Sequence, residues 1–216
     1  LELTAAYAMF PNGGFRVRPR GVVDIRDANG GYVERLHVER ESVVSPPVAF
    51  QMVTMLEDVV ERGTGTAARR VGVRGAVGGK TGTTNDYRDA WFVGFSSAAV
   101  VGVWVGFDQP ARIRDGGSGA QVALPIWAEF MKRTARRLPS GPFPVPRGMR
   151  AEQLCRISHQ LAVDGCPVYT EYFKAGDTVP VEECPVHRRT LAQRAQQAMQ
   201  SLLGRLKRRL SDVFGR

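Results

Sequence analysis

The sequence predicts an α+β fold in which helices cover an antiparallel sheet. Three runs rich in β-branched and aromatic residues, at 76–83, 90–95 and 98–107, follow one another with short connections, which favours antiparallel neighbours. Their nearly continuous apolar character indicates a sheet that is covered on both faces. Residues 46–62 and 124–138 carry apolar side chains at helical spacing, and the helix at 124–138 is expected to cover one face of the sheet. The helical region expected to bury the other face is missing from the sequence, which predicts an exposed apolar surface.

The N-terminal region adds a helix end and a hairpin. Residues 4–10 read as the end of a helix, which stops at the Pro-Asn-Gly-Gly turn that follows. The β-rich runs 15–26 and 32–37 are joined by an Asp-Ala-Asn-Gly-Gly stretch, which predicts a hairpin. Ser45 is a candidate N-cap for helix 46–62, which opens with two prolines. The positions expected to form the apolar face of this helix are Val48, Met52, Met55, Leu56, Val59 and Val60.

Composition divides the chain into four segments. Residues 1–139 hold the predicted α+β unit, and residues 140–150 form a linker with three Pro and two Gly. Residues 151–187 carry the three cysteines in a small module. Residues 188–216 are predicted to form a basic helix.

The formal charge of +9 sits mainly in the last segment. Residues 188–216 hold eight Lys or Arg against one Asp, so they account for +7 and leave +2 for residues 1–187. A body of so little net charge, without a recognisable nucleic-acid-binding motif, predicts no nucleic-acid partner. No apolar run approaches the roughly 18 residues that span a bilayer. The chain opens without Met or a signal peptide, which favours a chain that begins within a longer protein.

The sequence Gly79-Lys80-Thr81-Gly82-Thr83-Thr84 is the most informative stretch of the chain. A phosphate-binding loop is the first interpretation to test, because such a loop ends in Gly-Lys-Thr. That loop requires Gly six residues before the Lys and a helix after it. Position 74 is Arg, and a predicted strand follows instead, so the nucleotide interpretation fails on both counts.

Acyl transfer is the second interpretation of the same residues. On an extended strand, Lys80 supplies a positive charge near a serine nucleophile and a substrate carboxylate, while Gly82 leaves room for the substrate backbone. Thr81 and Thr83 alternate with Gly82, so both hydroxyls are expected to face a cleft and bind the carboxylate. The N–H of Thr83 is a candidate oxyanion-hole donor. The candidate catalytic residues are therefore Lys80 and Thr83, and the candidate substrate-binding residues are Thr81, Gly82, Thr83 and Thr84.

Several ordered motifs surround this strand. They are LELTAAYAMFPNGG at 1–14, ERGTGTA at 61–67, GKTGTTNDYRDAWFVG at 79–94, VWVGFD at 103–108, and GGSGA at 116–120 followed by PIW at 125–127. Together they resemble the transpeptidase domain of class A, bifunctional, penicillin-binding proteins, from residue 1 to about residue 138. Because the motifs occur in the same order along the chain, chance is an inadequate explanation of the match.

The resemblance implies a D,D-transpeptidase that cross-links peptidoglycan stem peptides and needs no cofactor. In this family a serine attacks the D-Ala-D-Ala bond, an acyl-enzyme forms, and β-lactams trap the same serine. It implies that Lys80 tunes the electrostatics of the site and that Asp89 and Trp91 support the sheet. It also implies a location at the extracytoplasmic face of the membrane, as part of a membrane-anchored parent in the periplasm.

The sequence departs from the family in its nucleophile. None of its nine serines has Lys three residues later or Asn two residues later, so the Ser-x-x-Lys and Ser-x-Asn motifs are absent. The chain alone is therefore predicted to be inactive. A D,D-carboxypeptidase or β-lactamase fragment is an alternative, although RDAWFVG at 88–94 favours the synthase. A different class of alternative is a non-catalytic module that recruits cell-wall partners.

The three cysteines have two interpretations. Cys155, Cys166, Cys184 and His187 form the pattern C-x10-C-x17-C-x2-H, which can supply a tetrahedral zinc site. Zinc knuckles normally contain two close ligand pairs, and only the last two residues here are close in sequence. One disulfide with a spare thiol is the preferred interpretation, because the family works in an oxidising compartment. Residues 155–187 also resemble a C-terminal extension that often follows class A transpeptidase domains.

The C-terminal segment 190–216 has apolar residues at helical spacing and basic residues on much of the remainder. Such a helix can lie on an anionic membrane surface. It can equally pack its apolar face on a protein domain and leave the charges in solvent. The sequence leaves both interpretations open.

Overall fold

The computed structural model describes residues 1–187 and residue 199. The chain divides into two compact units, Leu1–Met149 and Arg150–Arg216, and each is described by itself. The finer division into four segments stays a prediction. The predicted basic helix at 188–216 lies outside the described residues, apart from Met199.

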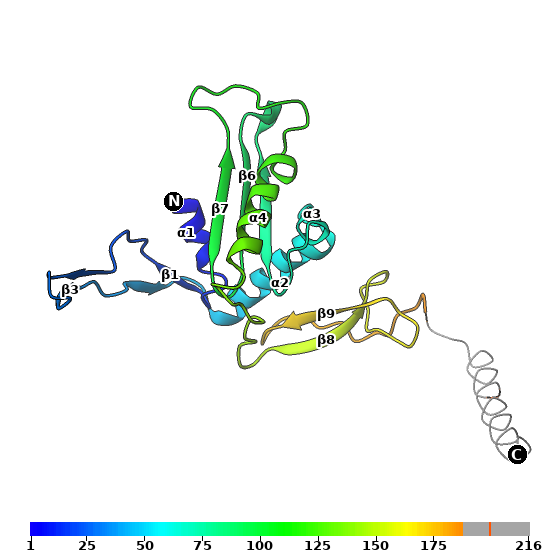
Figure 1. Ribbon diagram of the computed structural model, residues 1–216. Coiled ribbons are helices and arrows are strands. Elements are labelled where there is room, and N and C mark those ends of the chain that lie inside the picture. The colour runs from blue at the N-terminus through cyan, green and yellow to red at the C-terminus, as the bar shows by residue number, and fades with distance from the viewer. Residues whose placement is uncertain (188–198, 200–216) are drawn as a thin grey trace, which may run out of the picture. The chain divides into compact units, whose positions relative to one another are not determined.

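A three-stranded antiparallel sheet forms the centre of the first unit (Figure 1). Its strands are β5 (Gly78–Thr83), β6 (Ala90–Phe95) and β7 (Val100–Val105), and they are ordered β5-β6-β7. The antiparallel arrangement predicted from the short connections is confirmed. Helices α1 (Glu2–Ala8) and α4 (Leu124–Thr134) pack against this sheet, so the α+β prediction is confirmed as well.

Two glycines show that α1 and α4 cover opposite faces of the sheet. A Cβ at Gly94 would lie 2.7 Å from the Trp127 ring of α4, and a Cβ at Gly102 would lie 2.2 Å from Thr4 Oγ1 of α1. Gly94 pairs with Val101, the residue before Gly102, and adjacent strand residues face opposite sides. The sheet is therefore covered on both faces.

The core of the first unit lies between the sheet and α4. The Phe92 and Trp127 rings pack with their centroids 4.9 Å apart, and both side chains are fully buried. The buried cluster around them also contains Val60, Ala68, Val73, Val77, Ala123, Leu124 and Ala128. Close packing of this kind fixes the position of β6 and, through it, of the neighbouring β5.

Helix α2 (Pro46–Arg62) runs alongside β5, where a Cβ at Gly78 would lie 3.1 Å from the backbone of Leu56. Ser45 occupies the predicted N-cap position, but its side chain makes no capping hydrogen bond. The predicted apolar face is partly wrong, because Met55 is 59% exposed. The buried side chains are Ala49, Phe50, Val53, Leu56 and Val60, which follow the 3.6-residue period more closely than the predicted set does.

The N-terminal hairpin has a different construction from the predicted one. Strand β2 (Asp24–Arg26) pairs with β3 (Tyr32–Arg35) as predicted, but β1 (Phe15–Val17) pairs with an unpredicted strand, β4 (Arg40–Ser42). Pro19 interrupts the run 15–26 because it lacks the N–H that a strand ladder needs. Strand β4 has the sequence Arg-Glu-Ser, which carries no apolar alternation to mark it as a strand.

Several shorter elements complete the first unit. A short helix, α3 (Ala67–Arg70), precedes β5, and a 3₁₀ turn (Asn85–Tyr87) connects β5 to β6. A π-helical turn (Gly119–Ala123) leads into α4, which ends at Thr134 rather than at the predicted residue 138. No helix among the described residues combines the length and the apolar character needed to cross a membrane.

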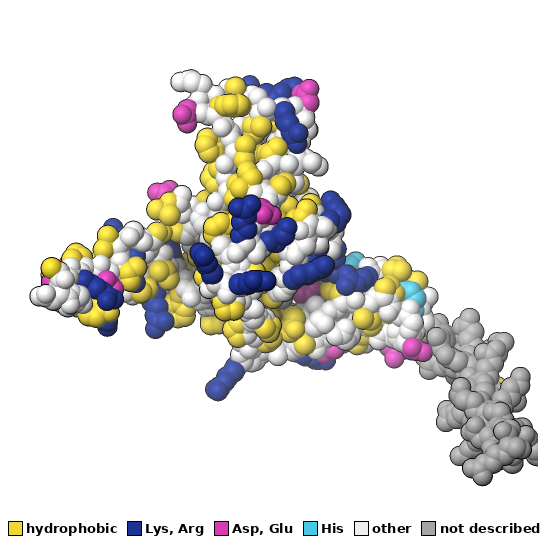
Figure 2. Space-filling model, viewed as in Figure 1, with side chains coloured by type: hydrophobic (Ala, Val, Ile, Leu, Met, Phe, Trp, Pro, Cys, Tyr) yellow, Lys and Arg dark blue, Asp and Glu magenta, His cyan; other side chains and the backbone are white. Residues whose placement is uncertain are grey.

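Basic side chains gather on the face of the first unit that carries α3 and α4 (Figure 2). Acidic partners offset part of this charge. Glu129 forms salt bridges with Lys132 and Arg133 on α4, and Glu61 forms one with Arg69 on α3. One face of the first unit is thus rich in basic side chains, although residues 1–187 carry a formal net charge of only +2.

In the second unit, β8 (Arg150–Cys155) pairs with β9 (Val168–Phe173) as a two-stranded antiparallel sheet. Leu161 forms isolated bridges with Leu154 and with Glu183. These bridges bring the end of β8 and the segment before Cys184 to the same place. The rest of the described unit consists of turns and irregular segments.

We expect Gly94→Ala to destabilise the first unit, because the new methyl group would overlap the Phe92 and Trp127 rings at 2.7 Å. Overpacking of a core typically costs about 1–3 kcal/mol. Urea denaturation measures the change. Gly21→Ala is the control, because a Cβ there meets nothing within 4 Å and should change stability little. Equal stability of the two variants would contradict the packing described here.

Glu57 on α2 predicts a pH dependence of stability. Partial burial, with the nearby Glu61 and Asp58 carboxylates, raises its pKa from 4.5 to about 7 despite the opposing effect of Arg69. The folded state therefore binds more protons than the unfolded state between these values, so wild-type stability falls as pH rises from about 4.5 to 7. Glu57→Gln should remove that loss, which is about 1–2 kcal/mol after allowance for solvent screening. Denaturation curves at pH 4 and pH 8 measure it, and parallel losses in both proteins would count against the assignment.

Candidate active site

Strand β5 carries Lys80, Thr81, Gly82 and Thr83, and it is the end strand of the described three-stranded sheet. Four of the five residues predicted for one site are therefore consecutive along a strand edge, and Thr84 follows them directly. Lys80 and Thr83 are exposed, and Thr81 and Gly82 are half-buried. An edge strand offers unpaired backbone groups as well as side chains.

The register of β5 fixes the direction of its backbone groups. The Thr84 N–H donates to the Asp89 carbonyl oxygen at 3.0 Å, so these two residues occupy a hydrogen-bonded position of the antiparallel ladder. The hydrogen-bonding direction of the backbone alternates from residue to residue along a strand. The N–H and C=O groups of Gly82 therefore point toward β6, whereas those of Thr81 and Thr83 point away from β6. The Thr83 N–H is thus directed to the open edge, as an oxyanion donor must be.

The side chains of Lys80 and Thr81 form a connected group at this edge. The Lys80 ammonium donates to the Thr81 carbonyl oxygen at 2.9 Å and lies 3.5 Å from the Thr81 hydroxyl. The Thr81 hydroxyl is also 2.9 Å from the hydroxyl of Thr64, in the turn after α2. Thr64 belongs to the Arg-Gly-Thr-Gly turn, and the sequence motif alone does not show that this residue contacts the site.

Thr83 is held by the turn that precedes α4. Its hydroxyl oxygen accepts a hydrogen bond from the Gly119 N–H at 3.0 Å. A Cβ at Gly119 would lie 2.2 Å from the Trp91 carbonyl oxygen and 2.6 Å from that of Gly82, so only glycine fits there. Because the Thr83 hydroxyl accepts from Gly119, its own proton remains available to an anionic ligand.

Thr84 and Asp89 close the turn at the end of β5. The Asp89 N–H donates to the Thr84 hydroxyl at 2.8 Å, and that hydroxyl lies 3.2 Å from the Asp89 carboxylate. The indole N–H of Trp104 donates to the other carboxylate oxygen at 3.0 Å, and the Trp104 and Trp91 rings are 6.4 Å apart. These contacts tie Thr84 into the turn, and its contact with substrate stays a prediction.

No serine among residues 1–187 is hydrogen-bonded to Lys80, whose ammonium contacts Thr81. Ser118 precedes Gly119 and so lies next to the Thr83 contact, but among the described residues its hydroxyl is not hydrogen-bonded to a Lys or His side chain. The described edge therefore offers a cation, hydroxyl groups and an outward N–H, without an activated nucleophile.

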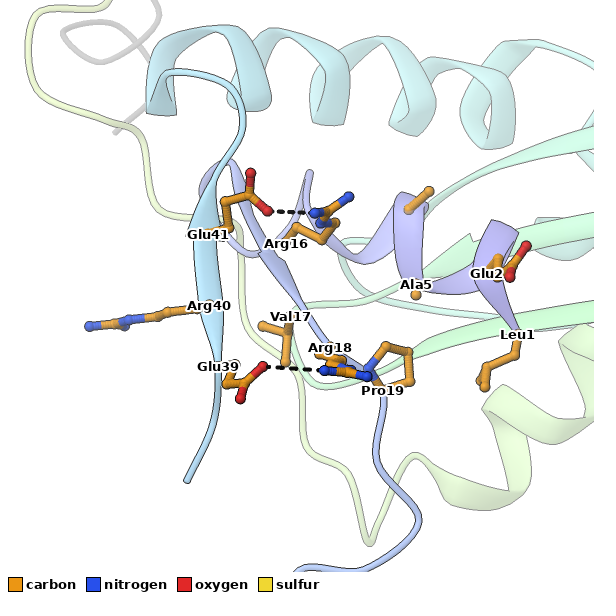
Figure 3. Close-up of a pocket in the computed structure, with 11 residues that line it drawn as sticks. Leu1, Glu2, Ala5, Arg16, Val17, Arg18, Pro19, Glu39, Arg40 and Glu41 are labelled. Atoms are coloured by element: carbon orange, nitrogen blue, oxygen red, sulfur yellow. Dashed lines mark hydrogen bonds and ion pairs between the residues drawn. The ribbon is translucent and has the colours of Figure 1, made fainter. Parts of the chain in front are cut away.

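A separate hollow of about 680 Å³ lies in the first unit between α1 and the β1–β4 pair (Figure 3). Two ion pairs line it, Arg16 with Glu41 and Arg18 with Glu39, while the Arg40 side chain points away from them. None of the β5 residues contributes to this hollow. Because its charges neutralise one another, it offers no comparable binding chemistry.

The second unit brings Cys155, Cys166, Cys184 and His187 together. One candidate ligand atom from each residue lies within 4.8 Å of the others. All three cysteines are free thiols, so the disulfide preferred in the sequence analysis is not formed. That preference was wrong because sequence spacing gave no sign that all four side chains converge.

The thiols of this cluster differ in acidity. Burial tends to raise the pKa of Cys184, but hydrogen bonds from the Ser158 side chain and the His187 backbone outweigh it and lower the pKa to about 7. Burial raises the pKa of Cys166 to about 11, and the neighbouring cysteines add to this effect. The cluster is thus chemically distinct from the strand edge at β5.

Comparison with known proteins agrees with both units. Residues 1–132 match the penicillin binding protein transpeptidase domain, and residues 145–189 match the penicillin-binding protein 1A C-terminal domain. These matches confirm the resemblance drawn from the sequence motifs.

Individual relatives show the same similarity. Penicillin-binding protein 1A of Aquifex aeolicus is 46% identical over 147 residues, a stretch that covers 68% of this chain and 20% of that protein. The Rickettsia bellii protein of the same name is 32% identical over 205 residues, covering 84% of this chain and 25% of that protein. The chain thus spans about a fifth to a quarter of the length of these curated relatives.

A solved structure of penicillin-binding protein 1A from Haemophilus influenzae superposes with a TM-score of 0.75 at 26% identity. The superposition covers 85% of this chain and 32% of that one. Because the transpeptidase model matches more than half of the residues, the chain belongs to the penicillin-binding protein transpeptidase domain family.

Proposed function

We propose that this chain forms the Lys-Thr-Gly side of the active site of a peptidoglycan D,D-transpeptidase. The observation that supports this most directly is the edge of β5, where Lys80, the two threonine hydroxyls and the outward Thr83 N–H occur together. The substrate class is the D-Ala-D-Ala end of a stem peptide, and β-lactams are its inhibitors.

The open edge of β5 suits an extended peptide. A substrate backbone can lie along an unpaired strand and use its outward N–H and C=O groups. Lys80 then supplies positive charge for the terminal carboxylate, and the hydroxyls of Thr81 and Thr83 donate hydrogen bonds to it. Gly82 lets β5 lie close to β6, because a Cβ there would lie 3.2 Å from the Trp91 Cβ.

The Thr83 N–H supplies the electrostatic part of catalysis. Attack of a serine on the peptide carbonyl develops negative charge on its oxygen, and a fixed donor lowers the energy of that state. The Gly119 bond to the Thr83 hydroxyl and the Thr84–Asp89 turn hold this donor in position. No Ser-x-x-Lys motif occurs in these 216 residues, so the proposal requires a serine and its Lys partner from another segment.

We place this activity in the cell wall, at the extracytoplasmic face of the membrane, as part of a membrane-anchored parent. A non-catalytic module that recruits cell-wall partners is the alternative class, and a D,D-carboxypeptidase or β-lactamase fragment is the alternative chemistry. The absence of the nucleophile motifs predicts that the chain alone forms no covalent adduct with penicillin.

A chimera with the Aquifex aeolicus relative tests the proposal. The segment of that protein matched by this chain is replaced by the corresponding residues here, and acylation by a fluorescent penicillin is followed on a gel and by mass spectrometry. The chimera should be acylated. Lys80→Ala should slow acylation roughly 10²–10³-fold, the loss expected when one fixed electrostatic contact to the reacting group is removed.

Lys132→Ala in the same chimera is the matched control, because Lys132 lies on α4 and its side chain is 42% exposed in a salt bridge with Glu129. It should acylate at the parent rate. Stable acylation of the isolated chain, or equal rates for the two Lys variants, would contradict the proposed role of β5.

We also propose that residues 190–216 contact an anionic membrane surface, on the sequence pattern alone. Co-sedimentation with liposomes containing anionic lipid should be lost when these residues are deleted, and it should weaken as salt rises. Liposomes of neutral lipid are the control. Binding that survives the deletion would assign the contact to another part of the chain.

A further inference from the structure

We propose that Cys155, Cys166, Cys184 and His187 bind one Zn²⁺ in a closed, four-ligand structural site in the second unit. Nothing in the transpeptidase activity requires this site, and the proposal does not depend on the role of β5. Three thiolates and one imidazole are a ligand set that zinc uses for structural sites. A site with four protein ligands leaves no open position for catalysis.

The distances among the four side chains already approach those of an occupied site. Zn–S bonds of about 2.3 Å and Zn–N bonds of about 2.0–2.1 Å place tetrahedral ligand atoms about 3.6–3.8 Å apart. His187 Nδ1 lies 3.4 Å from the Cys155 sulfur and 3.2 Å from the Cys184 sulfur, and all four ligand atoms lie within 4.8 Å of one another. Small side-chain adjustments are enough to admit the ion.

Backbone pairing brings the ligands together. Cys155 ends β8, and Leu161 bridges both to Leu154 beside it and to Glu183. The Cys184 N–H donates to the Leu161 carbonyl oxygen at 2.8 Å, which holds Cys184 next to the end of β8. The convergence of the cysteines is thus part of the strand framework.

Backbone amides surround the sulfurs as they do in a thiolate site. The Ile157 N–H points at the Cys155 sulfur at 3.4 Å, and the Val163 N–H points at the Cys166 sulfur at 3.3 Å. Three thiolates around one Zn²⁺ carry a net charge of −1, which such donors stabilise. Binding displaces the thiol protons into solvent and changes no oxidation state.

The small size of the unit gives the metal a structural purpose. Among residues 150–187 the buried apolar side chains are Leu154, Cys155 and Cys184, so two of the three are proposed ligands. The unit spans Arg150–Arg216, and units below about 70–80 residues usually need a disulfide, a metal or a partner, because their cores bury too little surface. A disulfide would join two sulfurs and leave the third thiol and His187 without a role, whereas zinc uses all four.

The experiment measures zinc in the full 216-residue chain, purified without added metal and again after supply of Zn²⁺. Elemental analysis and native mass spectrometry should find one zinc per chain, and removal by a chelator should lower the thermal transition of the second unit. Co²⁺ in place of zinc should give the intense visible absorption of a tetrahedral thiolate complex. X-ray absorption should report three sulfurs and one nitrogen.

His187→Gln and His159→Gln form a matched pair of variants. His159 lies in the same unit, but its Nδ1 contacts the Tyr169 hydroxyl at 3.2 Å and it is outside the cluster. His187→Gln should weaken zinc binding by at least the roughly 10- to 100-fold that loss of an outer-shell partner costs. His159→Gln should keep the affinity of the parent chain.

Three results would overturn the proposal. The first is a chain that binds no zinc while its thiols are reduced. The second is a disulfide between two of the cysteines in protein from an oxidising compartment, detected by alkylation without reduction. The third is equal zinc affinity in the two His variants. Because X-ray absorption on the parent chain reports the ligands directly, a variant that fails to fold does not remove the test.

Discussion

Strand β5 hydrogen-bonds to β6 on one side, and this one-sided pairing is the constraint on which the site depends. It directs the N–H and C=O groups of Thr81 and Thr83 away from the sheet, where a peptide can use them. The packing of the first unit serves this edge. Phe92 and Trp127 fix β6 from within the core, and β6 fixes the register of β5.

Contacts from distant segments hold the edge from both ends. Thr64, after α2, contacts the Thr81 hydroxyl, and Gly119, before α4, donates to the Thr83 hydroxyl. Both helices also belong to the core of the unit or lie alongside its sheet. The strand proposed to bind substrate thus owes its geometry to rigid elements, which is the arrangement that catalysis by fixed dipoles requires.

The two units achieve stability by different means. The first buries large apolar side chains between a sheet and helices, whereas the described part of the second buries little besides cysteines. A cation is the simplest group that satisfies several thiols and an imidazole at once.

Sequence reasoning succeeded where one local signal sufficed. Short connections between apolar runs predicted the antiparallel order of β5, β6 and β7, and the Lys-Thr-Gly stretch lies on a strand as predicted. It failed where distant residues decide the outcome. The pairing of β4 with β1 has no apolar pattern, and the buried face of α2 depends on which side meets the sheet.

The same limit applies to the neighbours of the site. Thr64 and Gly119 reach β5 only through the fold, and spacing alone cannot show that three cysteines and His187 converge. Position 119 requires glycine because a Cβ there would overlap carbonyl oxygens of β5 and β6. The sequence around position 119 gives no sign of this requirement. The motif therefore identifies the strand of the candidate site, and only the fold shows which distant residues contact that strand.

A crystal structure of the penicillin-acylated chimera tests most directly whether the Thr83 N–H is an oxyanion donor. The measured quantity is the distance from the Thr83 backbone nitrogen to the carbonyl oxygen of the acyl group. If the Thr83 N–H is the oxyanion donor, this distance should be that of a hydrogen bond, about 2.7–3.1 Å. An acyl carbonyl directed away from β5, with its oxygen bonded to donors elsewhere, would contradict the claim that this strand edge forms the oxyanion side of the site.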